Sequence, residues 1–299
     1  MSGCTPHCFK CQCPVDSLDM ILYTRGMRSM KIMVIDRDRQ AVEEIETICE
    51  NMADIELVVE PIKNNALETL RREKFDAVFF DPAPQNELRS FIIGARRGIA
   101  HYNPIIVSSR QLDVRDIRAQ GANDSLSKPI TVESFKKKLE NAKNLNELIA
   151  RLSDEKEDFP SREGVISKSA FYQIFISCLD RADRYGEVSF LTFARIENID
   201  AIRRDHGDEV ADEVNENLKR YTMRIRRLSD IAGRTASNEI CLMLGRPANE
   251  DEPKLAFNRF SESMAEYCEL ISTKDAKAEI GVYMMELPTG EIAYKKIFR

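Results

Sequence analysis

Short apolar runs alternate with helix-like or loop-like stretches over the first half of the sequence. We expect β-strands at residues 31–35, 56–59, 77–80, 104–107 and 124–126. An amphipathic stretch at residues 40–52 follows the first run with helical spacing. The intervening stretches are about as long as the crossover between two parallel strands requires. This alternation predicts a doubly wound parallel sheet, in which functional side chains collect beyond the carboxyl ends of the strands.

Polar side chains stand at these predicted strand ends. Asp36 closes the first run, Asp81 the third, and Ser109 and Lys128 follow the fourth and fifth. Because the carboxyl ends of parallel strands meet at one edge of the sheet, we expect the four side chains to converge. A carboxylate nucleophile can attack phosphorus only where cations offset the negative charges of both groups, so this set suits phosphoryl transfer.

The runs KIMVIDRD, DAVFFDPAP, PIIVSSR and SLSKPI resemble the response-regulator receiver family over about residues 30–140. The resemblance implies a flavodoxin-like fold with Asp81 as the phosphoacceptor and Asp36 in an acidic pocket that holds Mg²⁺. It also implies that Ser109 and Lys128 contact the phosphoryl oxygens, and that a histidine kinase or phosphotransfer protein is the donor. Arg37 departs from the family, because it places a permanent positive charge where a second acidic residue is usual. The alternative is a receiver-shaped docking or dimerisation module.

The stretch from residue 131 to residue 158 is highly charged, but it carries one apolar stripe. The stripe has the four-three spacing of a helical seam and consists of Ala142, Leu145, Ile149 and Leu152. It fits either a dimer stalk or a last receiver helix that packs onto its own sheet. Pro160 closes the segment, since the residue before a proline is biased away from helix. We therefore expect a receiver domain at 30–145, a helical linker at 146–160 and a second domain at 161–299. We also expect the protein to form a homodimer.

The second half mixes helices and strands without the regular alternation of the first. We expect helices at residues 169–185 and 208–228, and strands at 188–196, 231–234, 239–244 and 280–285. The second and third strands flank a turn at residues 235–238 and form a β-hairpin. The fragments SFLTFARIENIDAI, GDEVADEV, RRLSD and GRTASNEICLML resemble the GGDEF family of diguanylate cyclases over about residues 161–285. The resemblance implies an α+β domain.

The catalytic positions of that family are altered in this sequence. The family hairpin carries two glycines and then two acidic residues, and the corresponding residues here are Ala236, Ser237, Asn238 and Glu239. A second metal-binding carboxylate of the family aligns with Arg195, and its guanine-reading asparagine aligns with Arg203. Transfer at a pair of metal ions requires anionic ligands. The resemblance thus implies a degenerate, inactive domain, with an active cyclase that uses Glu197 and Glu239 as the weaker alternative.

A second motif of the family is retained. Arg227 and Asp230 form R-x-x-D at the distance from the hairpin where the family has its inhibitory site for cyclic di-GMP, and Arg259 aligns with a further arginine after a one-residue shift. A guanidinium can bond guanine O6 and N7, and a carboxylate accepts from the N1 and N2 edge. The resemblance implies an effector that binds cyclic di-GMP and docks to a downstream protein that the sequence does not identify. The alternative is a nucleotide-independent scaffold.

Composition argues against a nucleic-acid-binding protein and against a membrane protein. A net charge of −6 and a pI near 5.4 argue against a nucleic-acid-binding protein. No apolar run approaches the roughly 18 residues of a membrane span, so we expect a cytoplasmic protein with no membrane partner. Residues 1–29 form a Cys-rich segment, which we interpret as a disordered tail or an extension upstream of the true start. Its residues Cys4, Cys8, Cys11 and Cys13, together with His7, offer a metal site as the alternative.

Overall fold

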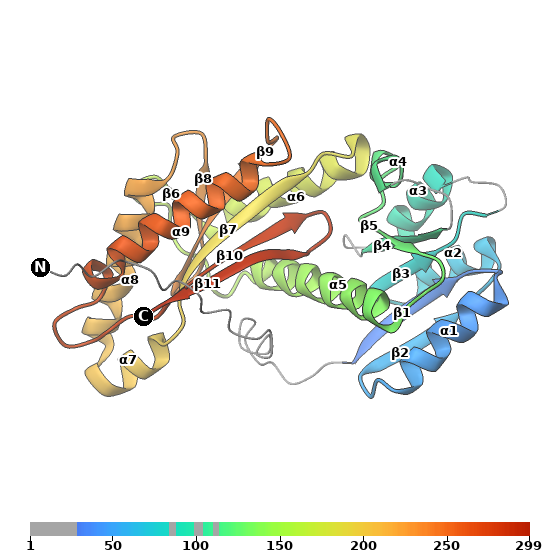
Figure 1. Ribbon diagram of the computed structural model, residues 1–299, viewed down its shortest axis with the longest axis horizontal. Helices are drawn as coiled ribbons and strands as arrows, with labels where there is room; N and C mark the ends of the chain where they lie inside the picture. Colours follow the sequence, from blue (N-terminus) through green and yellow to red (C-terminus); the bar gives the residue numbers. More distant parts are fainter. Residues whose placement is uncertain (1–28, 84–87, 99–103, 110–113) are drawn as a thin grey trace, which may run out of the picture.

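The computed structural model describes residues 29–83, 88–98, 104–109 and 114–299. The Cys-rich segment lies outside the described residues except for its last position. Two domains lie side by side, each built on one β-sheet (Figure 1). Among the described helices, none combines the length and the apolar character needed to cross a lipid bilayer.

The first domain contains a parallel sheet with the strand order β2-β1-β3-β4-β5. Its strands are β1 (Met30–Ile35), β2 (Ile55–Val59), β3 (Ala77–Phe80), β4 (Ile105–Ser109) and β5 (Asp124–Ser127). Helices α2 (Lys63–Arg72), α3 (Leu88–Gly98) and α4 (Val114–Ala119) cover one face, and α1 (Arg39–Glu50) and α5 (Val132–Ser153) cover the other. Because both faces are buried, the central strands β1 and β3 are nearly continuous apolar runs, whereas the edge strands β2 and β5 also carry polar residues. This order is that of the flavodoxin-like fold, which confirms the expected class.

The second domain is α+β, as expected, with the strand order β11-β10-β7-β9-β8-β6. Its strands are β6 (Val165–Ile166), β7 (Ser189–Ile196), β8 (Ile231–Ala236), β9 (Glu239–Gly245), β10 (Ile280–Leu287) and β11 (Ile292–Phe298). Helices α7 (Ile199–His206), α8 (Asp208–Ile225) and α9 (Glu252–Ile271) pack on one face. The other face packs against α6 (Lys168–Tyr185) and the end of α5.

Helix α5 belongs to both domains. It starts at a capping box formed by Thr131 and Ser134 and runs without a break to Ser153, passing beneath β10 and β11 (Figure 1). Ala142 packs in the first core, whereas Leu145, Ile149 and Leu152 pack in the second. The predicted stripe is therefore buried within one chain, so the dimer-stalk interpretation is wrong. The helix also runs through residue 146, the predicted start of the helical linker, so no break in the backbone separates the two parts there.

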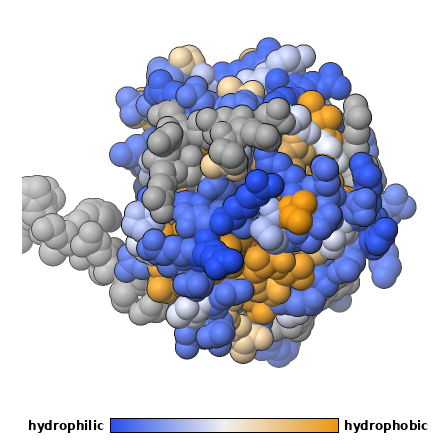
Figure 2. All heavy atoms as spheres, turned by 90° about the vertical axis from the view of Figure 1, so that its right-hand side faces the viewer, coloured by the Kyte–Doolittle hydropathy of each residue, from blue (hydrophilic) through white to orange (hydrophobic). Residues whose placement is uncertain are grey.

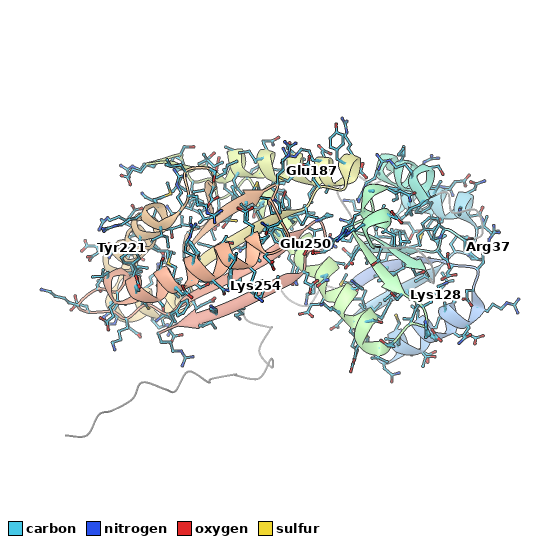
Figure 3. All side chains as sticks on the ribbon, turned by 45° about the horizontal axis from the view of Figure 1, so that its top comes forward. Arg37, Lys128, Glu187, Tyr221, Glu250 and Lys254 are labelled. Atoms are coloured by element: carbon cyan, nitrogen blue, oxygen red, sulfur yellow. The ribbon has the colours of Figure 1, made fainter. Side chains whose placement is uncertain are left out.

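Polar contacts close the interface between the domains. The Arg89 guanidinium donates to the Asp183 carbonyl at 2.6 Å, and Arg118 pairs with Glu286 at 2.6 Å. Figure 3 labels Glu250, a residue of the second domain that pairs with Arg115 of the first at 2.7 Å. Gly290, in the turn between β10 and β11, has φ +80°, and a Cβ there would lie 2.3 Å from the Asn141 carbonyl oxygen. The turn thus fits directly against the backbone of α5.

Candidate functional site

A buried lysine lies at the carboxyl edge of the first sheet. The Lys128 Nζ lies 2.6 Å from Asp36 Oδ2 and 2.5 Å from Asp81 Oδ2, and only 2% of the Lys128 side chain is exposed. Burial alone would lower the pKa of Lys128, but hydrogen bonds to Asp36 and Asp81 raise it above its usual value. The structure therefore brings together three of the four residues that the sequence places at strand ends. Ser109 closes β4, but its side chain lies outside the described residues.

Two further residues of this pocket were missed by the sequence reasoning. Asp38 Oδ2 lies 3.7 Å from the Lys128 Nζ, and the Asp38 backbone N–H donates to Asp36 Oδ1 at 2.9 Å. Ser108, which is also buried, donates its hydroxyl to Asp36 Oδ2 at 3.4 Å. The signal for Asp38 was present, since it stands two residues after Asp36 and immediately before helix α1.

Arg37 does not fill the cation position, contrary to our expectation. Its side chain is exposed, and its Nε donates to the Pro61 carbonyl at 3.4 Å. Figure 3 labels Arg37 and Lys128 at the end of the molecule that is remote from the second domain. Asp36, Asp38 and Asp81 thus surround one ammonium, and three carboxylates against one lysine leave two negative charges in the pocket.

In the second domain, the hairpin of β8 and β9 turns Asn238 inward. This side chain is 3% exposed, and its Nδ2 donates to the Ile196 carbonyl at 2.7 Å. Arg234 holds the turn from outside by donating to the Ser237 carbonyl at 2.7 Å. Asn238 therefore presents an amide N–H to the end of β7.

Glu239, the next residue, is fully buried, and both of its carboxylate oxygens accept hydrogen bonds. Its Oε1 accepts from the Thr235 hydroxyl at 2.6 Å and lies 3.0 Å from Arg151 Nη2. Its Oε2 accepts from the Tyr283 hydroxyl at 2.7 Å and from Arg151 Nη1 at 3.2 Å. These contacts use all the lone-pair positions of a carboxylate. Burial alone would raise the pKa of Glu239, but Arg151 and then Arg195 outweigh it and hold that pKa below its usual value.

No sequence pattern indicates this cluster of Arg151, Glu239 and Tyr283. Arg151 lies 88 residues before Glu239, and Tyr283 lies 44 residues after it. Glu197, the other acid of the alternative catalytic site, has its pKa raised by burial, and one of its oxygens is buried without a described hydrogen-bond partner. Over the part of the chain that the structure describes, no three His, Cys, Asp or Glu side chains are arranged to hold a metal ion.

The R-x-x-D motif forms a tight turn after α8. The Asp230 N–H donates to the Arg227 carbonyl at 3.1 Å, and the Arg227 N–H donates to Asp230 Oδ2 at 3.2 Å. The Arg227 guanidinium turns away from Asp230 and pairs with Glu252 of α9 at 2.8 Å. Arg226 instead reaches back to the Asp230 carbonyl at 3.0 Å.

Asp230 and Arg259 nevertheless share a cavity, which lies between β7, β9 and the start of α9. Arg226, Thr192 and Phe260 also line it, and its volume is about 30 Å³. This volume corresponds to about one water molecule, so the cavity is too small to enclose an organic ligand. Leu228, within the motif itself, is 96% exposed beside this region. The structure thus groups Arg226 with the predicted Asp230 and Arg259, and it places the Arg227 side chain at the edge of the group.

Comparison with known proteins finds likeness in two separate parts of the chain. No protein-family model and no curated protein matches it. One part is similar to the receiver domain of the sensor histidine kinase PA1611 of Pseudomonas aeruginosa, solved with magnesium in its active-site cleft. The identity is 19% over 38% of this chain and 95% of that one, with a TM-score of 0.34. A response regulator of Thermotoga maritima is 22% identical over 38% of this chain and 97% of its own, with a TM-score of 0.35.

Another part is similar to the GGDEF domain of DgcB of Caulobacter crescentus, solved in complex with c-di-GMP. The identity is 15%, the match covers 42% of this chain and 74% of that one, and the TM-score is 0.34.

Replacing Arg151 with methionine should strongly destabilise the second domain. The Arg151→Met variant would leave the buried Glu239 carboxylate without its cation, which typically costs about 3–5 kcal/mol. Urea unfolding at pH 7 would measure this loss, with the exposed Lys136→Met on the same helix as the control. A difference below about 1 kcal/mol between the two variants would contradict the assignment.

The loss in free energy of unfolding that Arg151→Met causes should also become smaller as pH falls. The folded-state pKa of Glu239 is depressed, so its contribution is complete above its unfolded value and is lost as pH drops through the folded pKa. In the variant, burial without Arg151 should raise that pKa, so protonation relieves the penalty. A gap between wild type and variant that is constant from pH 7 to about pH 4 would count against this mechanism.

Proposed function

We propose that the chain is a catalytically inactive effector of a two-component-type system that binds cyclic di-GMP through its second domain. The observation that carries the proposal is a contrast within that domain. The hairpin acid, Glu239, is saturated by protein groups, whereas Asp230 and Arg259 line one surface cavity. The second candidate, a nucleotide-independent scaffold, is supported by the small volume of that cavity.

Three features of the hairpin and of the neighbouring strand β7 support catalytic inactivity. Asn238 presents an amide N–H to the Ile196 carbonyl, and Arg195 pairs in register with Glu239 across β7 and β9. The third is Glu239, whose oxygens already bind Thr235, Tyr283 and Arg151. Joining two GTP molecules would require free anionic ligands for metal ions, and a guanidinium at this point repels such ions.

The chemistry around Asp230 suits a guanine base joined to phosphates. The Asp230 carboxylate can accept from guanine N1 and N2, and the Arg259 guanidinium can donate to O6 and N7 or stack on the ring. Arg226 and Arg259 line the cavity with Asp230, and Arg227 pairs with Glu252 beside it, so three positive charges and two negative ones lie in this region. The surplus positive charge favours an anionic ligand.

Glu252 competes with such a ligand. It holds the Arg227 guanidinium at 2.8 Å, and its other oxygen accepts from the Ala248 N–H at 2.6 Å. The backbone hydrogen bond from Ala248 and then Arg227 lower the pKa of Glu252, so it is anionic at neutral pH. A phosphate that binds Arg227 must therefore displace this carboxylate.

For the first domain we propose that Asp81 accepts a phosphoryl group from a histidine kinase or phosphotransfer protein. An Asp81 carboxylate oxygen forms the new bond to phosphorus as the bond to the donor breaks, and Lys128 offsets the charge. The surplus of two negative charges in the pocket fits a divalent cation, which Asp36 and Asp38 would hold in competition with Lys128. Bound Mg²⁺ would neutralise charge on the phosphoryl oxygens.

The surface beside this pocket suits a protein donor. Ile62, next to the Pro61 carbonyl that binds Arg37, is 49% exposed, and Val132 is 51% exposed. Figure 2 views the molecule from this end and shows an apolar area surrounded by hydrophilic side chains. An apolar centre with a polar rim is the usual composition of a protein–protein contact.

Calorimetric titration of the full chain with cyclic di-GMP tests the main proposal. We expect Arg259→Ala and Asp230→Asn each to weaken binding by about tenfold or more, because each removes a charged hydrogen-bonding group. Glu252→Gln should tighten binding, since an amide still accepts from Ala248 but releases Arg227. The exposed Arg224→Ala serves as the control. Equal binding heats for the wild type and Arg259→Ala would show that cyclic di-GMP does not bind at this cavity. The absence of binding heat for the wild type would favour the nucleotide-independent scaffold.

Catalytic inactivity is tested by incubating the protein with GTP and either Mg²⁺ or Mn²⁺. We expect no cyclic di-GMP, because the hairpin offers no free acidic ligand to a metal pair. The double variant Arg195→Asp, Asn238→Glu tests whether the two missing carboxylates alone restore turnover. Any product from the unmodified protein would overturn this part of the proposal.

The phosphoacceptor is tested by treating the protein with acetyl phosphate and Mg²⁺ and measuring the intact mass. We expect one phosphoryl group on the wild type and none on Asp81→Asn, with the exposed Asp54→Asn as a control that is still modified. Modification of Asp81→Asn to the wild-type level would place the acceptor elsewhere.

A further inference from the structure

Helix α8 lies at the end of the molecule that is remote from the first domain (Figure 1), and one of its exposed faces has an ordered pattern of charge. Side chains that recur every three or four residues share one face of a helix. On α8 such a face is formed by five exposed residues, namely Glu209, Glu213, Glu216, Arg220 and Arg224. This charged stripe has its three acids in the first half of the helix and its two arginines in the second half.

The helix itself does not account for the order of these charges. The helix dipole favours acids at the start and bases at the end, but only within the first and last turns. Glu213 and Arg220 lie in the middle turns of α8. Glu209 and Glu213 are four residues apart and repel each other, as do Arg220 and Arg224. Among the residues that the structure describes, none forms an ion pair within 4.0 Å with any of these four side chains. Counter-charges from another molecule would relieve both repulsions.

An apolar patch lies beside the middle of the charged stripe. It centres on Leu270 of α9, which is 55% exposed. Tyr267, one turn earlier on α9, stacks on Tyr221 of α8 with ring centroids 4.7 Å apart. The carbonyl of Ile271, the residue after Leu270, accepts from the Asn217 Nδ2 at 3.3 Å, and Asn217 stands in the middle of α8. Leu270 and the two stacked tyrosines therefore lie next to the point where the stripe changes sign.

We propose that the charged stripe and the apolar patch form an interface with a second copy of the chain. The two α8 helices would run antiparallel around a two-fold axis at the middle of the helix. Glu213 and Arg220 are equally far from that middle, on opposite sides, and so are Glu209 and Arg224. A two-fold axis there places each of these acids opposite an arginine of the second copy, so the surface is complementary to itself.

The second copy fits this surface better than a partner of uniform charge. An acidic or a basic protein would match one half of the stripe and repel the other, and a parallel pair of helices would oppose like charges. The same two-fold axis brings together the two apolar patches, because each lies beside the middle of its α8. The interface would thus have an apolar centre and a charged rim.

This arrangement leaves the first domain of each copy uncovered. Figure 3 labels Tyr221 at the opposite end of the molecule from Arg37 and Lys128. The dimer would therefore be elongated, with the two phosphoacceptor pockets at its outer ends. The proposal depends neither on phosphoryl transfer nor on cyclic di-GMP binding.

Sedimentation equilibrium of the full chain, without nucleotide or phosphoryl donor, tests the proposal. We expect a monomer–dimer equilibrium that weakens about tenfold or more when NaCl is raised from about 0.05 M to about 0.5 M, because salt screens exposed ion pairs. Glu213→Arg and Arg220→Glu should each weaken the dimer about tenfold or more, since each creates two contacts between like charges. A wild type that stays monomeric up to about 100 μM would overturn the proposal.

Mixing the two single variants gives the sharpest test. In a mixed dimer, the Glu213→Arg copy faces the Arg220→Glu copy, so both contacts again join opposite charges. We expect the mixture to dimerise with about the affinity of the wild type, as should the double variant Glu213→Arg, Arg220→Glu. A local defect in α8 would not be repaired by mixing. Single variants that dimerise like the wild type, or a mixture that stays monomeric, would place the interface elsewhere.

The apolar patch is tested by Leu270→Asp, which should abolish the dimer. Leu255→Asp is the matched control, because Leu255 is 64% exposed near the start of the same helix α9 and should leave the dimer intact. Circular dichroism should show both variants folded. If a charge variant fails to fold, this leucine pair and the salt dependence still decide the question. Equal dimerisation of the two leucine variants would contradict the proposal.

Discussion

The ion pair between Arg151 and Glu239 controls the arrangement of the second domain. A carboxylate in the middle of a sheet stays charged only where cations and hydroxyl donors compensate its lost hydration, and Arg151, Tyr283 and Thr235 do this here. The guanidinium comes from α5, a helix that begins four residues after Lys128. The same helix therefore packs on the first sheet and completes the charge balance of the second.

The described sites differ in how completely the protein neutralises its own charges. Around Lys128 the carboxylates outnumber the cations, so the pocket keeps a surplus of negative charge. Around Glu239 the balance is closed by internal groups, which leaves nothing for an external ion. Around Asp230 and Arg259 the balance favours the arginines. At each site, the net charge depends on all the residues that the fold brings together. The residues of the sequence motif alone do not determine it.

Sequence patterns predicted the first sheet well because its central strands are buried on both faces and form nearly continuous apolar runs. Asp36, Asp81 and Lys128 were found together because strand ends of a parallel sheet meet at one edge. The patterns failed where side-chain direction or a distant partner decides the result. Arg37 points outward and Asp38 inward, although they are adjacent. No local pattern links Arg151 with Glu239.

The apolar stripe of α5 shows the same limit, since helical spacing predicts that one face is buried but not which surface covers it. The stripe is divided between two cores, with Ala142 in one and Leu145, Ile149 and Leu152 in the other. A helix of 22 residues spans about 33 Å, enough to serve both. The first domain therefore has its own interior, whereas the second is completed by the end of a helix that starts in the first. A break in the chain after this helix would leave apolar surface bare on both products, so the end of α5 has to stay with the second domain.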